Sequence, residues 1–229
     1  FAGRDPRIAM TIIYPGMDWN GTVVNTLDKT INGKDNANYP PSANNASKTA
    51  LTWRKYLDEQ YANGIWNTNA CPIVIRYAEV LLTYAEAVNE LSGPSADVYD
   101  KLDLIRGRVG MPKVDREKYA SKETLRRLIR RERGVELAGE GVRRADILRW
   151  KDDNGKMVAE TVLNGVLERV VGTVNYAETD PTKRAEIDTN APATDKKIED
   201  RVFKVHNRYN PIPQGAIDNN PNLEQNPGY

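Results

Sequence analysis

Cysteine and histidine are almost missing from this sequence, which has one of each, Cys71 and His206, among 229 residues. A single cysteine excludes an internal disulfide and any zinc site built from several thiolates. A single histidine excludes a metal centre made of several imidazoles. Apolar runs of about 18 residues are also missing, so no segment is predicted to span a membrane. We therefore expect no metal site.

Neither sign of charge is in excess, since 33 basic residues stand against 32 acidic ones. A nucleic-acid-binding protein usually carries a basic excess on one face, so no nucleic-acid partner is expected. The sequence also lacks a G-x-S-x-G, a P-loop and a G-x-G-x-x-G motif, which are typical of a serine nucleophile and of nucleotide sites. We therefore expect no cofactor. A chain of this length forms one large domain or two small ones.

Phenylalanine is scarce, with 2 residues, whereas 11 tyrosines and 4 tryptophans are present. Rings that carry a polar atom favour half-wet positions, including binding surfaces. A flat ring covers the apolar face of a sugar, while amides and carboxylates nearby bond its hydroxyl groups. Ordinary packing of these rings is the alternative, above all for Trp53 and Tyr56 inside a strand. The candidates for stacking on a sugar are Trp19, Tyr39, Trp53 and Trp66.

Three regions differ in composition. Residues 1–71 are rich in Asn, Gly and Pro and are predicted to be a loop-rich ligand-binding region. Residues 72–151 are predicted to be a core of helical hairpins, and residues 152–229 an irregular C-terminal region that wraps this core. The whole is expected to be one continuous domain. Short strands are predicted over Ile8–Tyr14, Leu51–Tyr56 and Arg201–His206, and the proline-rich end of the chain is expected to form no regular elements.

Apolar residues recur at helical spacing in the middle region. Ser95 and Ser121 precede two of these stretches and are predicted to be N-caps. Gly110 and Pro112 end the helix that starts after Ser95. The first helix carries one apolar stripe of Tyr77, Leu81, Tyr84, Val88 and Leu91 and a second of Ala78, Leu82 and Ala85. The third carries Leu125, Leu128, Ile129, Val135 and Ala138.

The densest charge pattern surrounds Glu132 and Glu136, which share a helix face because they are four residues apart. Paired carboxylates are typical of glycoside hydrolysis, with one as acid and one as base or nucleophile. Five or more arginines nearby favour the ionised form and oppose a proton-donating role. We therefore favour an ion-pair network that ties helices together, and assign no catalytic residue. Trp150, at the end of this pattern, is assigned to the helical core.

Six segments, in order along the chain, form one set of motifs. They are R-D-P-R at 4–7, R-Y-A-E-V-L-L-T-Y-A-E-A-V-N at 76–89, L-D-L-I-R-G-R-V-G-M-P at 102–112, 129–150, P-I-P-Q at 211–214 and N-P-N-L-E-Q-N-P-G-Y at 220–229. This set resembles the motifs of the SusD/RagB family of nutrient-binding outer-membrane lipoproteins of Bacteroidetes. One departure is Gly139, which stands where phenylalanine is common in that family.

The resemblance implies a mostly α fold, with tetratricopeptide-like helical hairpins, long irregular loops and a few short strands. It implies a protein that is not an enzyme. Such a protein binds oligo- or polysaccharide at the cell surface and delivers it to a SusC-like TonB-dependent transporter. The family is about twice this length, so the chain is expected to be a C-terminal portion whose N-terminal half, with the lipid anchor to the outer membrane, is missing. The alternative is a protein–protein adaptor that uses the helix pairs and binds no sugar.

Overall fold

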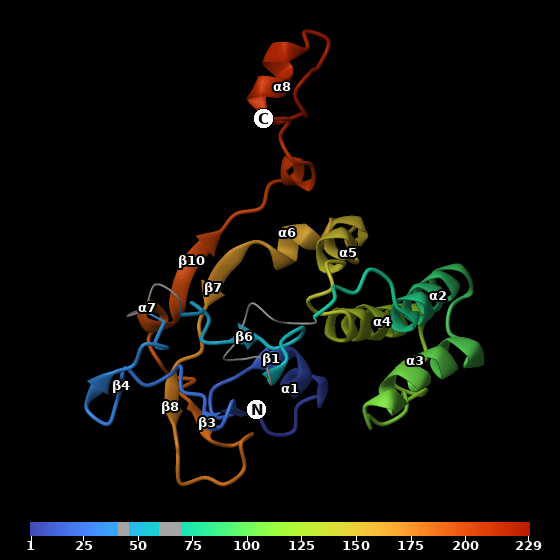
Figure 1. Cartoon of the computed structure of the whole chain (residues 1–229). Coiled ribbons are helices and arrows are strands. Elements are labelled where there is room, and N and C mark those ends of the chain that lie inside the picture. The colour runs from blue at the N-terminus through green and yellow to red at the C-terminus, as the bar shows by residue number, and fades with distance from the viewer. Residues whose placement is uncertain (41–45, 60–69) are drawn as a thin grey trace. The chain divides into compact units, whose positions relative to one another are not determined.

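The structure, a computed structural model, describes residues 1–40, 46–59 and 70–229. One of the stacking candidates, Trp66, lies outside these residues. The chain forms two compact units (Figure 1). Unit 1 consists of Phe1–Arg143 and Arg169–Lys196, and unit 2 of Arg144–Glu168 and Lys197–Tyr229. The division into three regions at residues 71 and 151 stays a prediction.

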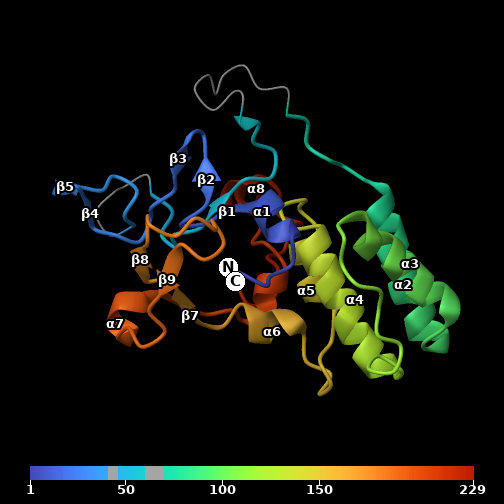
Figure 2. The ribbon, with the colours of Figure 1, turned by 90° about the horizontal axis from the view of Figure 1, so that it is seen from below.

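Three helices make the helical part of unit 1. Helix α2 (Tyr77–Ser92) packs against both α3 (Ala96–Arg108) and α4 (Lys122–Glu136), as Figure 2 shows. The predicted caps are confirmed: the Ser95 side chain accepts a hydrogen bond from Val98 N, and that of Ser121 from Thr124 N. With 36% helix and 14% strand, the protein is mostly α, as predicted.

The core of the three helices is formed by apolar side chains from each of them. For α2, the main predicted stripe is right in part, because Leu81 is buried and Val88 packs against the core, alongside Leu82 and Ala85 of the second stripe. Tyr77, Tyr84 and Leu91 are instead 71%, 44% and 86% exposed. The buried cluster consists of Leu81, Leu82, Ala85, Val98, Tyr99, Leu102, Ile105, Val114, Leu125, Leu128, Ile129 and Leu137.

The N-terminal segment begins with a helix rather than the predicted strand. Helix α1 (Arg7–Thr11) starts after Asp5, whose carboxylate accepts a hydrogen bond from Arg7 N. Strand β1 (Ile12–Ile13) then pairs antiparallel with β6 (Thr52–Trp53). The run of branched residues after Arg7 is typical of a strand, but the Asp5 turn fixes the first of them as helical.

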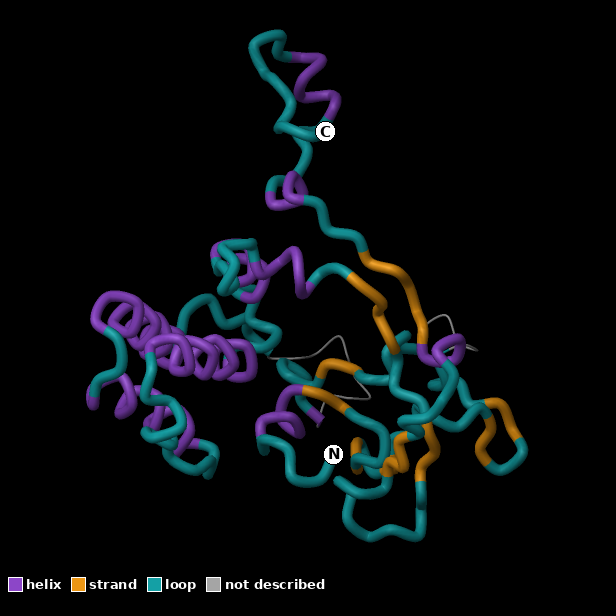
Figure 3. The backbone as a smooth tube through the Cα atoms, turned by 180° about the vertical axis from the view of Figure 1, so that it is seen from behind, coloured by secondary structure: helices purple, strands orange, loops and turns teal. Residues whose placement is uncertain are grey.

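The rest of unit 1 consists of short hairpins, drawn in orange in Figure 3. Two of them turn at Asn-Gly pairs, Asn20-Gly21 and Asn32-Gly33, and all four residues have positive φ angles. Asn-Gly is the preferred turn of a two-residue hairpin, so the loop predicted after residue 32 contains regular structure. The paired elements are β2 (Asp18–Trp19) with β3 (Thr22–Val23), β4 (Thr30–Ile31) with β5 (Lys34–Asp35), and β8 (Gly172–Val174) with β9 (Ala185–Ile187), followed by α7 (Ala193–Lys196).

Unit 2 has its own small core. Trp150 is 3% exposed and packs with Ile147, Met157 and Ala159, so it is buried, but in this cluster and not in the predicted helical core of α2, α3 and α4. None of the helices in the described part of the chain is long and apolar enough to cross a membrane. The elements that frame this core are α5 (Arg143–Arg149), α6 (Val158–Val162) and the antiparallel pair β7 (Gly165–Glu168) and β10 (Lys197–Arg201).

The end of unit 2 differs from the prediction. The strand predicted over Arg201–His206 lies earlier, as β10, and a 3-10 turn at Val205–Arg208 follows it. Helix α8 (Gln214–Asn219) forms between the prolines. The side-chain amide of Gln225 accepts from Ile212 N and donates to Ile212 O, which closes the segment on itself. That long-range contact permits a regular element where local composition predicts none.

Candidate functional site

Two of the stacking candidates carry a guanidinium group over one ring face. Trp19 lies in β2 and is half-buried, with the Arg54 guanidinium carbon 5.1 Å from its ring centroid. Tyr39 is also half-buried, and the Arg169 guanidinium carbon lies 5.3 Å from its ring. Each cation–π contact occupies a face that a sugar would otherwise cover. These rings therefore offer a ligand at most one free face.

Trp53 is the open ring of the three described candidates. It lies in β6 and is 56% exposed. Its ring lies on Gly139, where an added Cβ atom would come within 3.3 Å of the ring atom Cζ3. Gly139 also has a φ angle of +78°, a conformation that favours glycine. The departure from phenylalanine at residue 139 thus makes room for the tryptophan, and the alternative in which Trp53 is packed inside a strand is wrong.

The strand that carries Trp53 is fastened on both sides. The Lys55 ammonium group donates to the backbone oxygens of Glu136, at 3.2 Å, and Ala138, at 3.0 Å, and pairs with the Glu140 carboxylate. A cation at the carboxyl end of a helix is stabilised by the helix dipole, and here the helix is α4. Arg54 N donates to Thr11 O at 2.9 Å, behind the strand. The backbone that follows Trp53 is therefore held between Thr11 and the end of α4, and we call the Trp53 ring a platform.

A small cavity of about 180 Å³ lies beside this platform. It is lined by Ile12, Thr49, Leu51, Thr52 and Trp53. The walls combine apolar surface with two threonine hydroxyls, and Thr52 is exposed. A ring with an apolar wall and hydroxyl groups nearby matches the two surfaces of a sugar. We name this group of five residues the Trp53 site.

The Glu136 carboxylate is held by three arginines. It is 2.6 Å from Arg76 Nη1, 2.8 Å from Arg108 Nη2 and 2.9 Å from Arg7 Nη1. Burial raises the pKa of Glu136, but the hydrogen bonds from Arg76 and Arg7 outweigh that effect and place its pKa below the usual range. The carboxylate is thus ionised and is a poor proton donor.

Glu132 belongs to the same network. Its Oε1 atom lies 2.6 Å from Arg7 Nη2 in an ion pair that lacks hydrogen-bond angles, and its Oε2 atom accepts from Arg106 Nη1 at 3.0 Å. The prediction of an ion-pair network is confirmed. Its partners, however, come from α1, α3 and the residue before α2 rather than from the arginines adjacent in sequence. Sequence reasoning missed Arg7, whose only signal is its place in the R-D-P-R segment.

No three His, Cys, Asp or Glu side chains come together as metal ligands within residues 1–40, 46–59 and 70–229. Among the described residues, the candidate sites are therefore the Trp53 site and the ion-pair network, and neither is a metal centre.

Two solved structures of other proteins share the fold of this chain. A SusD-like protein from Bacteroides fragilis superposes with a TM-score of 0.70 at 25% identity, over 100% of this chain and 39% of that one. A surface glycan-binding protein from Bacteroides uniformis has a TM-score of 0.52 at 19% identity, over 99% of this chain and 38% of that one, which is a likeness of fold.

Two relatives found by sequence are also described as SusD-like proteins. SusD-like protein P25 of Formosa agariphila is 34% identical over 154 residues, 62% of this chain and 29% of the relative. SusD-like protein P2 of the same organism is 30% identical over 166 residues, 66% of this chain and 33% of the relative. The chain thus spans about a third of the length of these relatives. The family model described as the SusD family matches residues 1–229, and the chain therefore belongs to the SusD family.

Proposed function

We propose that the chain is part of a non-catalytic protein that captures oligo- or polysaccharide at the bacterial cell surface and delivers it to a SusC-like TonB-dependent transporter in the outer membrane. The observation that carries the proposal is Trp53, an exposed ring on a fastened strand beside a cavity of about 180 Å³. Family membership and a structural neighbour described as a surface glycan-binding protein support it.

The test is affinity electrophoresis in gels that contain a polysaccharide. Trp53→Ala removes the platform, and we expect about tenfold weaker retention, since a well-stacked ring contributes on the order of 1 kcal/mol beyond the area it buries. Trp53→Phe keeps a flat ring and should retain most of the binding. Tyr77→Ala, which removes an even more exposed ring from α2, is the matched control and should bind normally.

Trp19 and Tyr39 remain proposed contacts of lower rank, because a guanidinium group covers one face of each. Their alanine variants should weaken retention less than Trp53→Ala does. Unchanged retention in Trp53→Ala, with an unchanged circular dichroism spectrum, would contradict the Trp53 site. Retention that is lost equally in Tyr77→Ala would contradict it as well.

A second candidate function is the protein–protein adaptor, and one observation favours it. The outer face of α2 exposes Tyr77, Val80 and Tyr84, of which Val80 is 52% exposed. Val80 and Tyr84 line a shallow depression of about 390 Å³ together with Ile75 and Ala87. Apolar surface of this kind suits a helix of a partner. Calorimetric titration with a panel of glycans distinguishes the adaptor from the glycan-binding protein, because an adaptor gives no heat of binding with any glycan.

A further inference from the structure

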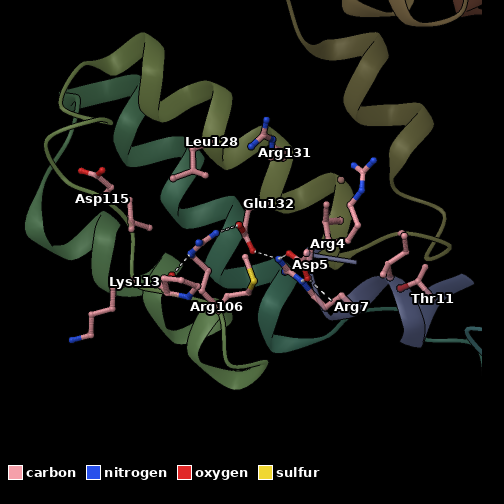
Figure 4. A pocket seen from close by; sticks show the side chains of 18 of the residues that line it. Arg4, Asp5, Arg7, Thr11, Arg106, Lys113, Asp115, Leu128, Arg131 and Glu132 are labelled. Carbon is pink, nitrogen blue, oxygen red and sulfur yellow. Dashed lines mark hydrogen bonds and ion pairs between the residues drawn. The ribbon is translucent and has the colours of Figure 1, made fainter. Parts of the chain in front are cut away.

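A further cavity of unit 1, distinct from the small Trp53 pocket, has a volume of about 850 Å³. It opens between α1, the loop that follows α3, and one face of α4 (Figure 4). Ile8, Leu128 and Val135 give it an apolar wall. Ile12, which pairs with Trp53 across the two strands, lines this cavity and also the smaller one. The two cavities are therefore neighbours that share the Ile12 side chain as a wall.

Two of the three carboxylates that line the large cavity are paired with arginines. Figure 4 shows Glu132 between Arg106 and Arg7, with ion-pair distances of 3.0 and 2.6 Å. Asp5 also pairs with Arg7, at 2.6 Å. The Asp115 carboxylate accepts the backbone hydrogen bonds that start the following turn. Backbone N–H groups are neutral, so Asp115 keeps its negative charge and is the carboxylate of this cavity that no described basic side chain pairs with.

The cations of the cavity are not balanced in the same way. Six basic side chains line it against three acidic ones, although the whole chain is close to neutral. Arg7 and Arg106 are used by Glu132. Within the described residues, the exposed side chains of Arg4, Lys113 and Arg131 make no hydrogen bond or ion pair. Positive charge without a protein partner is thus concentrated around an apolar wall.

We propose that this cavity binds an acidic sugar unit, a uronic acid or a sulfated sugar, while the adjoining unit of the same chain stacks on Trp53. This inference rests on the proposed function and specifies its substrate class. The carbon face of the sugar packs on Ile8 and Leu128. Its carboxylate or sulfate accepts paired hydrogen bonds from Arg131 and Arg4, because the planar guanidinium group matches both anions.

The experiment is calorimetric titration of the intact protein with two matched pairs of ligands. Tetragalacturonate is compared with its fully methyl-esterified form, and a sulfated galactan tetrasaccharide with its desulfated form. Each pair differs in charge but hardly in size. We expect at least one acidic member to bind about tenfold more tightly than its neutral partner, and the preference to shrink as salt is raised from 50 to 500 mM. The pair of ligands that shows this preference identifies the anionic group as a carboxylate or a sulfate.

The double variant Arg4→Gln, Arg131→Gln should lose the preference for the acidic ligand and keep the affinity for the neutral one. The control double variant Lys34→Gln, Lys48→Gln removes the same net charge from exposed positions outside the cavity and should leave the preference intact. Trp53→Ala should weaken the acidic and the neutral ligand alike. Circular dichroism confirms that each variant is folded.

Equal affinity for both members of both pairs overturns the inference, and so does a preference that survives in the double arginine variant. Either result, with neutral ligands that still depend on Trp53, leaves the proposed function standing. Absence of binding by every tetrasaccharide and by a panel of polysaccharides refutes the proposed function and this inference together.

Discussion

Glu136→Gln is the substitution that tests the ion-pair network most directly. The side chain is 1% exposed and contacts Arg7, Arg76 and Arg108. Glutamine keeps the shape and one acceptor oxygen but removes the charge. Arg7, with only 5% of its side chain exposed, then lies buried with fewer anionic partners. The expected result is a loss of stability, since a buried charge without its partner is strongly unfavourable.

The magnitude follows from how exposed each partner is. Loss of one partner of a buried ion pair costs about 3–5 kcal/mol. The Arg108 side chain is 55% exposed, so its share is about 0–1 kcal/mol. Arg76 keeps Glu140, and Arg7 keeps Asp5 and Glu132. We therefore expect the lower end of the range, about 3 kcal/mol at pH 7.

The pH dependence has a definite sign. The pKa of the Glu136 carboxyl is lower in the folded protein than its ordinary value of 4.5, because burial is outweighed by the bonds from Arg76 and Arg7. The unfolded chain therefore binds the proton more readily, and the stabilisation is complete above pH 4.5. It is lost as the pH falls through the folded-state pKa. The difference between the native protein and Glu136→Gln should accordingly shrink below pH 4.5.

The assay is urea unfolding followed by circular dichroism, which reports mainly on α2, α3 and α4 of unit 1. Measurements at pH 7 and pH 3.5 give the two free energies of unfolding. Glu117→Gln is the matched control, since Glu117 is exposed, and it should change stability by less than about 0.5 kcal/mol. A loss below about 1 kcal/mol for Glu136→Gln at pH 7, or a loss equal at both pH values, would refute the reasoning.

Two further substitutions test the platform and the helix start. Gly139→Ala places a Cβ atom 3.3 Å from the Trp53 ring at a positive φ angle, and it should lower the free energy of unfolding by about 1–2 kcal/mol in thermal unfolding. Gly141 also has a positive φ angle but has open space around it, so Gly141→Ala measures the backbone strain alone. An equal loss of stability in both variants would contradict the contact between residue 139 and the ring. Ser121→Ala removes the acceptor for Thr124 N and should cost about 1 kcal/mol and speed amide exchange in the first turn of α4, whereas unchanged exchange would count against the cap.

Local signals predicted the helical part well. Serine followed by apolar residues at spacings of three and four located α3 and α4, and both serine caps bond as expected. The buried face of α2 was harder, because both faces are apolar and only its packing against α3 and α4 decides between them. Tyr77, Tyr84 and Leu91 fit the helical period as well as Leu82 and Ala85 do, yet they are exposed.

The site depends on contacts that spacing does not encode. Arg169 covers one face of the Tyr39 ring although the two residues are 130 positions apart in the sequence. No local pattern around Tyr39 therefore predicts that this face is covered. Trp53 rests on Gly139 in the same long-range manner. The sequence shows that Gly139 departs from the phenylalanine common in the family. No sequence pattern near residue 139, however, predicts that Trp53 lies on this glycine. The identity of the candidate rings was thus predictable, whereas their accessibility was not.

Arg7 bonds Glu136 across 129 positions of the chain, and this separation orders the events of folding. A chain made from its amino terminus presents Arg7 long before α4 exists, so α1 has no carboxylate to meet at first. Arg76, Arg106 and Arg108 lie nearer in sequence and can neutralise the glutamates while the loop to Arg7 is still open, since closing a long loop carries the larger entropy cost. We therefore expect residues 1–13 to dock on α3 and α4 after these helices have packed with α2, and not to nucleate their folding.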